Sequence, residues 1–212
     1  MIRFKNREEA GKMLAQSIPP LQGDIFVLGI PRGGVVVAAP VASMLQANLD
    51  IIITRKIGAP FNPELALGAI TPDGTTLYND DLVNKFNISK TELKRVEERE
   101  LEEIKRRMKL YRQNTEPPDV HNKVVILVDD GIATGFTVQA ALQGLKKQKA
   151  RRIILAVPVA PPDTVSMLKE QVDDLICLAS PEPFYAVGQF YEDFRQVSDE
   201  EVIELLQNNQ RY

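Results

Sequence analysis

Five short apolar segments constrain the fold of this chain more than any other feature. Each is roughly five residues long and rich in β-branched side chains, which favours a buried strand. They are residues 25–30, 50–54, 124–128, 152–159 and 175–179. Helical patterns lie between most of them, at residues 35–45, 136–149 and 164–171. Strands that alternate with helices pair in parallel through right-handed crossovers, so we predict an α/β fold with a parallel sheet flanked by helices.

Further elements complete a predicted single domain over residues 1–212. Asn6 and Glu9 indicate the start of a helix that ends near residue 18, and Ser198 with Glu201 starts a last helix. The turn signal at residues 72–74 predicts a hairpin between residues 67–70 and 75–78. Residues 89–113 are predicted to form one long amphipathic helix, within a helical insertion at about residues 79–118. This helix is either a solvated packing helix, or a dimer arm or a hood over the acceptor.

The chain of 212 residues has one histidine, His121, and one cysteine, Cys177. Closed zinc sites use about four His or Cys ligands, and a disulfide needs a second cysteine. A Ser-His-Asp triad would depend on His121 alone. The chemistry is therefore expected to use carboxylates, hydroxyls, Lys or Arg, backbone amides, or a metal bound by oxygen.

Charge and hydropathy also exclude classes of partner. Lys and Arg total 26 against 29 Asp and Glu, a net charge of −3, so we predict no nucleic-acid partner. No apolar run approaches the roughly 18 residues of a membrane span, so no membrane association is expected. The N-terminal residues lack the apolar stretch of a signal peptide. We therefore predict a cytoplasmic location.

The segment most informative about function follows the strand at residues 124–128. Two carboxylates, Asp129 and Asp130, come first, and a loop of small residues then leads into a helix. Backbone amides at a helix N-terminus bind phosphate, whereas carboxylates suit sugar hydroxyls or Mg²⁺. A phosphate site beside a diol site fits a ribose 5-phosphate. Ligands of parallel sheets bind beyond the strand ends, where we expect residues 31–34, 55–64 and 129–137 to gather as loops.

This segment resembles the phosphoribosyl-diphosphate signature of the type I phosphoribosyltransferase family, as does the strand-helix order of most of the chain. The resemblance implies that Asp129 and Asp130 hold the ribose hydroxyls and Mg²⁺ during catalysis. It also implies a phosphate loop for the 5-phosphate. Its residues are Gly131, Ile132, Ala133, Thr134, Gly135, Phe136 and Thr137.

Two further segments resemble the family's diphosphate sites. Arg32, Gly33 and Gly34 match a pyrophosphate loop, in which the family often has a cis peptide, expected here near residues 31–32. Arg55 and Lys56 resemble the pair that opens a flexible loop over the site, although both fit solvated surface charges as well. The resemblance thus gives Arg32 and Lys56 catalytic roles.

The C-terminal segment, about residues 181–212, resembles a hood that binds the acceptor base. By position, Tyr185 would stack on the base, with Phe184 as an alternative and Val187 beside it, and Glu192 would help to bind Mg²⁺. An aromatic core cluster explains the same residues equally well. Ala133 replaces an Asp of hypoxanthine-type enzymes and matches adenine-type loops, so the nucleobase stays open.

The resemblance implies an Mg²⁺-dependent enzyme. It would transfer phosphoribose from phosphoribosyl diphosphate to a nucleobase-like nitrogen and release pyrophosphate. The alternative is a non-catalytic regulator of the same fold that binds a nucleotide or phosphoribosyl diphosphate. A phosphotransfer module is disfavoured because the chain has no Gly-Lys-Ser/Thr loop. The expected partners are small molecules, with a homodimer left open.

Overall fold

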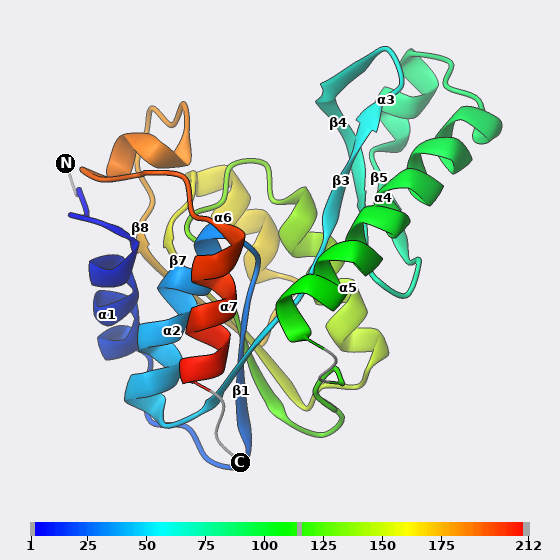
Figure 1. Cartoon of the computed structure of the whole chain (residues 1–212). Coiled ribbons are helices and arrows are strands. Elements are labelled where there is room, and N and C mark those ends of the chain that lie inside the picture. Colours follow the sequence, from blue (N-terminus) through cyan, green and yellow to red (C-terminus); the bar gives the residue numbers. More distant parts are fainter. Residues whose placement is uncertain (1–2, 114–115, 210–212) are drawn as a thin grey trace.

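The computed structural model describes residues 3–113 and 116–209. Its centre is a parallel five-stranded sheet in the order β2-β1-β6-β7-β8, drawn in Figure 1. The strands are β1 (Ile25–Gly29), β2 (Asn48–Ile51), β6 (Val124–Val128), β7 (Arg152–Val159) and β8 (Asp174–Ala179). All five predicted strands are thus present, and the predicted α/β fold class is confirmed.

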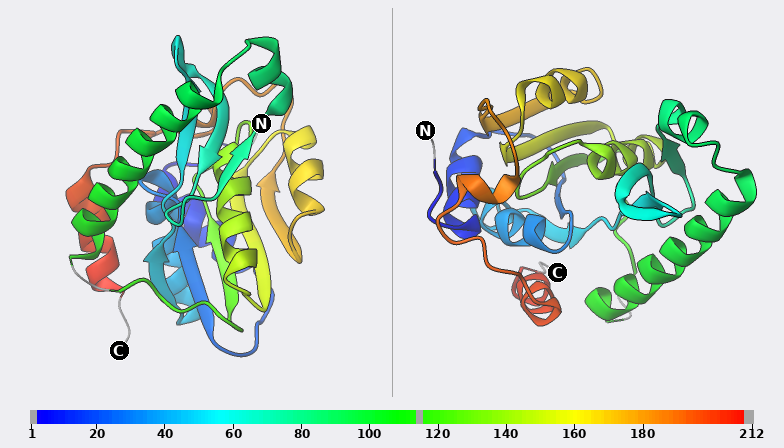
Figure 2. Two further views of the ribbon diagram at one scale, coloured as in Figure 1. Left: turned by 90° about the vertical axis from the view of Figure 1, so that its right-hand side faces the viewer. Right: turned by 90° about the horizontal axis from the view of Figure 1, so that it is seen from above.

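Helices cover both faces of this sheet, as the view from above in Figure 2 shows. One face carries α1 (Arg7–Ser17), α2 (Gly33–Leu45) and α7 (Asp199–Asn208). The other carries α5 (Phe136–Lys147) and α6 (Pro162–Lys169). Alternate side chains of β6 enter two separate apolar cores, with Ile126 on the α2 side and Leu127 on the α5 side. Burial on both faces explains why every residue of this strand is apolar.

A second unit, which we call the arm, projects from the edge of this body (Figure 1). It contains an antiparallel sheet of β3 (Arg55–Ala59), β4 (Asn62–Ile70) and β5 (Thr76–Tyr78). Two helices follow, α3 (Asp80–Lys85) and α4 (Lys90–Arg112). The predicted hairpin is confirmed, because Ile70 of β4 pairs with Thr76 of β5. The long helix is confirmed as α4, with both hydrogen bonds of the Ser89–Glu92 capping box present.

The loop predicted at residues 55–64 is wrong, because most of this segment belongs to the β3–β4 hairpin. The resemblance of Arg55 and Lys56 to a pair that opens a flexible loop predicts this loop, but both residues belong to β3, whose pairing with β4 shifts register around Gly58. A Cβ on Gly58 would lie 2.4 Å from the Pro63 carbonyl oxygen, so only glycine lets the two strands approach this closely.

The remaining helix ends agree with the capping signals in the sequence. The Asn6 side chain accepts a hydrogen bond of 2.9 Å from the Glu9 amide, and Ser198 caps α7 through the Glu201 amide. The C-terminal segment also holds a short 3-10 helix, η1 (Val187–Phe190). Across the described residues, we find no helix whose length and apolarity would let it span a bilayer.

Candidate active site

The candidate site lies at the carboxyl ends of β1 and β6, where two of the predicted segments touch. A Cβ on Gly33 would lie 1.9 Å from Oδ2 of Asp130. A Cβ on Gly34 would lie 2.9 Å from the Cα atom of Asp129. The glycine pair therefore has a packing reason: it lets the start of α2 lie directly against the two carboxylates.

Each carboxylate of this pair is held by groups of the protein. Oδ1 of Asp129 accepts a hydrogen bond of 2.9 Å from the Asp130 amide, and Oδ2 of Asp130 accepts one of 2.7 Å from Nε of Arg7. The Tyr191 hydroxyl donates to the Asp130 carbonyl oxygen at 2.5 Å. The second oxygen of each carboxylate accepts no hydrogen bond from the described residues, so it is free to accept one from a ligand.

Burial dominates the electrostatics of this pair. It raises the pKa of Asp129 well above its ordinary value, and the neighbouring Asp130 carboxylate raises it further. Burial also raises the pKa of Asp130, but the Arg7 guanidinium opposes that rise. The pair thus needs a cation, and Arg7 supplies one from α1.

Arg7 is itself fixed on several sides. Its side chain is only 10% exposed, and its Nη1 donates a 2.8 Å hydrogen bond to the Arg195 carbonyl oxygen. The guanidinium carbon also lies 3.8 Å from the centre of the Phe194 ring, a cation–π contact. Arg7 therefore joins α1 to the carboxylate pair and to the C-terminal segment.

The phosphate loop differs from the carboxylate pair because its backbone N–H groups are not engaged by the described residues. Within the described residues, the backbone N–H groups of residues 133–137 donate to no protein acceptor, as expected at a helix N-terminus. Thr134 is exposed and Thr137 is half-buried. Gly135 has a φ of 79°, a left-handed conformation that suits glycine at this bend. These donors form a cradle suited to an anion.

Ile132 departs from the expected phosphate contact. Its amide donates to the Val159 carbonyl oxygen at 2.9 Å, and its side chain is buried in the α5-side core. Ile132 therefore packs the loop against the core, and its amide is not available to a phosphate. The Thr164 hydroxyl, which donates to the Ala133 carbonyl oxygen at 2.8 Å, fixes the loop from α6.

Arg32 follows a cis peptide bond between Pro31 and Arg32, as expected. Its Nη1 lies 3.8 Å from Oδ1 of Asp199 on α7. The same carboxylate oxygen accepts a 2.5 Å hydrogen bond from the Tyr111 hydroxyl of α4. Burial, together with Asp199, raises the pKa of Tyr111 to about 12. Arg32 therefore faces the junction of α4 and α7, whereas the glycines that follow it lie against the carboxylate pair.

Arg55 and Lys56 lie on β3 of the arm. Arg55 forms an ion pair of 2.9 Å with Glu100, a buried residue of α4. Neighbouring side chains of a strand point to opposite faces, so Arg55 and Lys56 do not face a single diphosphate from this hairpin. Their expected joint role would require the hairpin to change shape.

The predicted base-site residues differ in their surroundings. The Phe184 ring packs on Phe190 with centres 5.0 Å apart, which assigns it to the core cluster. Tyr185 is 84% exposed and available for stacking. Val187 lies over the start of the phosphate loop, since a Cβ on Gly131 would approach its Cγ1 to 2.5 Å.

The predicted metal set is only partly assembled. In residues 3–113 and 116–209, no group of three or more His, Cys, Asp or Glu side chains is placed to bind a metal ion. Glu192, which is exposed, therefore does not join Asp129 and Asp130 in a metal site, a correction to the sequence prediction. The two aspartates keep one open oxygen each, which fits Mg²⁺ arriving with a phosphate ligand, since this ion binds through one or two carboxylates plus phosphates.

Arg7 and Tyr191 are the site residues that the sequence prediction missed. A signal for Arg7 exists, because it shares a helix stripe with the buried residues Ala10 and Leu14, where a solvated side chain is out of place. Tyr191 gives no comparable signal, since its contact with Asp130 joins residues 61 positions apart.

Comparisons with known proteins complete the description. A model of the phosphoribosyl transferase domain matches residues 5–195. A Mycobacterium tuberculosis protein provisionally named a phosphoribosyl transferase is 43% identical over 209 residues, which is 98% of this chain and 47% of that protein. The chain therefore spans about half the length of the curated relatives it matches first.

Two other similarities are informative. A crystal structure of a Thermus thermophilus protein, TT1426, has 38% sequence identity and a TM-score of 0.83, and the match covers 99% of this chain and 100% of that one. A uracil phosphoribosyltransferase from Lactobacillus gasseri is 39% identical over 66 residues, 31% of this chain and 32% of that enzyme.

Proposed function

Because the chain belongs to the phosphoribosyltransferase family, we propose that it transfers phosphoribose from phosphoribosyl diphosphate to a nucleobase-like nitrogen. Mg²⁺ is the proposed cofactor and pyrophosphate the second product. In this reaction the bond between C1 of the ribose and the diphosphate oxygen breaks, and a bond from C1 to the ring nitrogen forms with inversion. The diphosphate leaves with the electron pair, and the acceptor nitrogen loses a proton.

One observation supports this proposal above all others. N–H groups of residues 133–137, which meet no acceptor among the described residues, lie directly after two carboxylates that each keep an oxygen without a hydrogen bond from those residues. The N–H groups and threonine hydroxyls suit the 5-phosphate, whereas the carboxylates suit the ribose hydroxyls, which are hydrogen-bond donors. One ribose 5-phosphate satisfies both sets at once.

The roles of the residues follow from this pose. Asp129 and Asp130 orient the ribose, and the phosphate loop holds the other end of the sugar phosphate. Arg32, Gly33 and Gly34 are the proposed contacts of the leaving diphosphate, and Arg55 and Lys56 of the arm would join them only if the β3–β4 hairpin changes shape. Such a site catalyses by positioning and by stabilising the charge that develops. Tyr185 is the proposed stacking partner of the acceptor ring.

Mg²⁺ would be held by the open oxygens of Asp129 and Asp130 together with the diphosphate, whose charge it would neutralise. Arg7 would not bind this ion, because it is itself a cation; its hydrogen bond occupies Oδ2 of Asp130.

Titration calorimetry tests the binding step. We expect the protein to bind phosphoribosyl diphosphate only with Mg²⁺, and Asp130→Asn to weaken binding. Because Asp130 also pairs with Arg7, the melting temperature of each variant is measured alongside. Thr134→Val serves as a second variant, since the Thr134 hydroxyl has no hydrogen-bond partner in the part of the chain that the structure describes. Binding unchanged in both variants contradicts the proposed site.

Turnover is tested separately with labelled phosphoribosyl diphosphate, Mg²⁺ and a panel of nucleobases. The proposal predicts a labelled nucleotide and one equivalent of pyrophosphate with at least one base. Tight binding without product across the whole panel favours a ligand-binding regulator of the same fold.

A further inference from the structure

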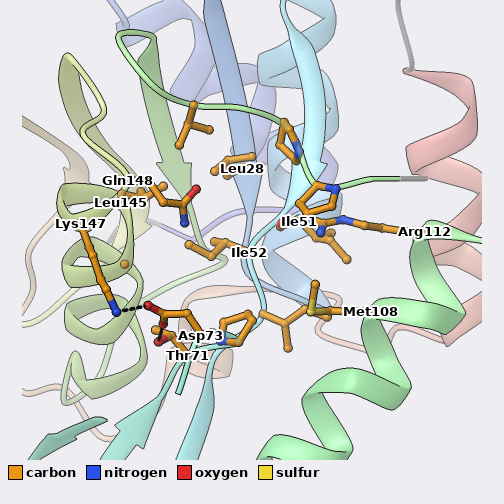
Figure 3. Close-up of a pocket in the computed structure, with 16 residues that line it drawn as sticks. Leu28, Ile51, Ile52, Thr71, Asp73, Met108, Arg112, Leu145, Lys147 and Gln148 are labelled. Atoms are coloured by element: carbon orange, nitrogen blue, oxygen red, sulfur yellow. Dashed lines mark hydrogen bonds and ion pairs between the residues drawn. The ribbon is translucent and has the colours of Figure 1, made fainter. Parts of the chain in front are cut away.

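A cavity of about 460 Å³ lies where the arm meets the body, shown in Figure 3. Its walls come from the ends of β1 and β2, from the last turns of α4 and α5, and from the turn that precedes β5. None of its lining residues belongs to the glycine loop, the phosphate loop or the C-terminal segment. It is therefore separate from the proposed phosphoribosyl-diphosphate site.

The cavity has the character of a small-molecule site. Apolar side chains form most of its surface, among them Leu28, Ile52 and Leu145, which Figure 3 labels. Its volume lies within the range of roughly 300–1,000 Å³ that is typical of ligand pockets, and such pockets are mostly apolar with a few placed polar groups.

Arg112 supplies such a polar group. It reaches from α4 towards the cavity (Figure 3), and its side chain is only 10% exposed. Nε lies 3.2 Å from Oδ1 of Asp50, and Nη2 donates to the Ile51 carbonyl oxygen at 2.9 Å. Nη1 is buried and has no hydrogen-bond partner among the described residues. A buried donor without an acceptor destabilises the protein, and a ligand oxygen would remove that penalty.

The other charges around the cavity already have partners. Asp73 accepts hydrogen bonds from Lys147 at 2.6 Å and from the Thr71 hydroxyl at 2.5 Å, on the wall opposite Arg112. Asp50 is engaged by Arg112 itself. The N–H groups on Nη1 are thus the polar atoms of this wall that most need a partner. Met108, one turn before Arg112, is an adaptable side chain beside it.

We propose that this cavity binds a small apolar molecule that carries one carboxylate. The carboxylate accepts from Nη1 of Arg112 once a small rotation of the guanidinium exposes this buried atom to the cavity, because a charged donor and a charged acceptor make the stronger hydrogen bond. The apolar body of the molecule lies between Ile52 and Leu145.

Naphthalene-2-carboxylate is a suitable probe, with naphthalene-2-carboxamide as its neutral match. Calorimetry on the full chain, saturated with phosphoribosyl diphosphate and Mg²⁺, should show that the acid binds and that the amide binds about fivefold more weakly. No binding of the acid at millimolar concentration overturns the proposal. Equal affinity for acid and amide overturns the role of Arg112.

Gly144→Leu is the decisive variant. Gly144 lines the cavity, and a Cβ there would meet only Thr71, at 3.7 Å, so a larger side chain enters the cavity without a backbone clash. The exchange also favours the helix, since glycine is a poor helix former. We expect Gly144→Leu to abolish binding of the acid, whereas Arg151→Met, at an exposed residue outside the cavity, leaves it unchanged. Binding that survives Gly144→Leu places the probe elsewhere and contradicts the proposal.

Arg112→Lys tests the head group in the same experiment. Lysine keeps the charge but loses the guanidinium fork, so affinity for the acid should fall to about that for the amide. If this variant loses its fold, the comparison of acid with amide in the wild-type protein still decides the role of Arg112.

Discussion

The carboxylate pair and the phosphate loop are adjacent in sequence, yet the protein treats them in opposite ways. Asp129 and Asp130 are crowded by glycines and held by Arg7 and by an internal amide. The N–H groups of residues 133–137 meet no acceptor in the part of the chain that the structure describes. A buried charge must be balanced by other groups of the fold, whereas exposed N–H donors can bind water until a ligand replaces it. Changes at the pair should therefore act on stability, and changes at the loop on affinity.

Arg7→Met should have the largest effect, because it leaves Asp130 buried without its cation. Breaking such a pair costs about 3–5 kcal/mol, and we expect that loss in the free energy of unfolding measured with urea. Arg151→Met is the matched control, since Arg151 is exposed and donates to a single backbone carbonyl oxygen. Equal losses in both variants would contradict the contrast between the two regions.

The cost of Arg7→Met should also depend on pH. Burial already raises the pKa of Asp130, and loss of the Arg7 charge raises it further. A carboxyl with a raised pKa penalises the folded state above its unfolded-state pKa of about 4, and the penalty disappears below that pH. The stability gap to the wild type should therefore be widest near neutral pH and narrow as the pH falls towards 4. If the difference in stability between Arg7→Met and the wild type does not change with pH, the lost stability comes from packing alone.

Gly33→Ala should have the next largest effect. The added Cβ would overlap Oδ2 of Asp130 at 1.9 Å and approach Nε of Arg7 to 2.8 Å. Overpacking of this kind costs about 1–3 kcal/mol and should displace the carboxylate that orients the ribose. The melting temperature and the affinity for phosphoribosyl diphosphate should both fall. Gly144→Ala, where the new Cβ has room, is the control and should not lower the melting temperature.

Thr134→Val tests the phosphate loop, where we expect an effect on affinity and not on stability. Its hydroxyl has no protein partner among the described residues, so the melting temperature should stay at the wild-type value. The dissociation constant for phosphoribosyl diphosphate should rise about tenfold, the value of one hydrogen bond to a charged group. A lower melting temperature with unchanged affinity would reverse the assignment of this loop.

Asp199→Asn should have the smallest effect. It removes the charge 3.8 Å from Arg32, which is then released towards the diphosphate. Because the pair is partly exposed, we expect affinity to improve only about two- to threefold at low salt, with the gain lost at high salt. Calorimetry at two salt concentrations checks this, and weaker binding at low salt would contradict it.

The sequence predicted most of the body because its signals are local. Apolar runs mark buried strands, and a capping box such as Ser89 with Glu92 marks a helix start. The β3–β4 hairpin was not predicted, because the family resemblance of Arg55 and Lys56 favours a flexible loop and the pairing of the two strands carries no comparable local signal. The site residues divide in the same way between local sequence signals and contacts of distant segments. Gly33, Gly34, Asp129 and Asp130 belong to local motifs, whereas Arg7, Tyr191 and the separation of Glu192 depend on contacts between distant segments.

The hydrogen bonds of Arg7 to Asp130 and Arg195 affect the order in which this protein folds. Its two hydrogen-bond partners lie 123 and 188 positions further along the chain, at Asp130 and Arg195. Contacts between such distant residues form late, because much of the chain must be ordered before they become favourable. During synthesis Arg7 leaves the ribosome well before Arg195, which follows it by 188 positions. The carboxylate pair therefore acquires its complete surroundings only after Arg195 has been made, and a shorter nascent chain has no finished site to occupy.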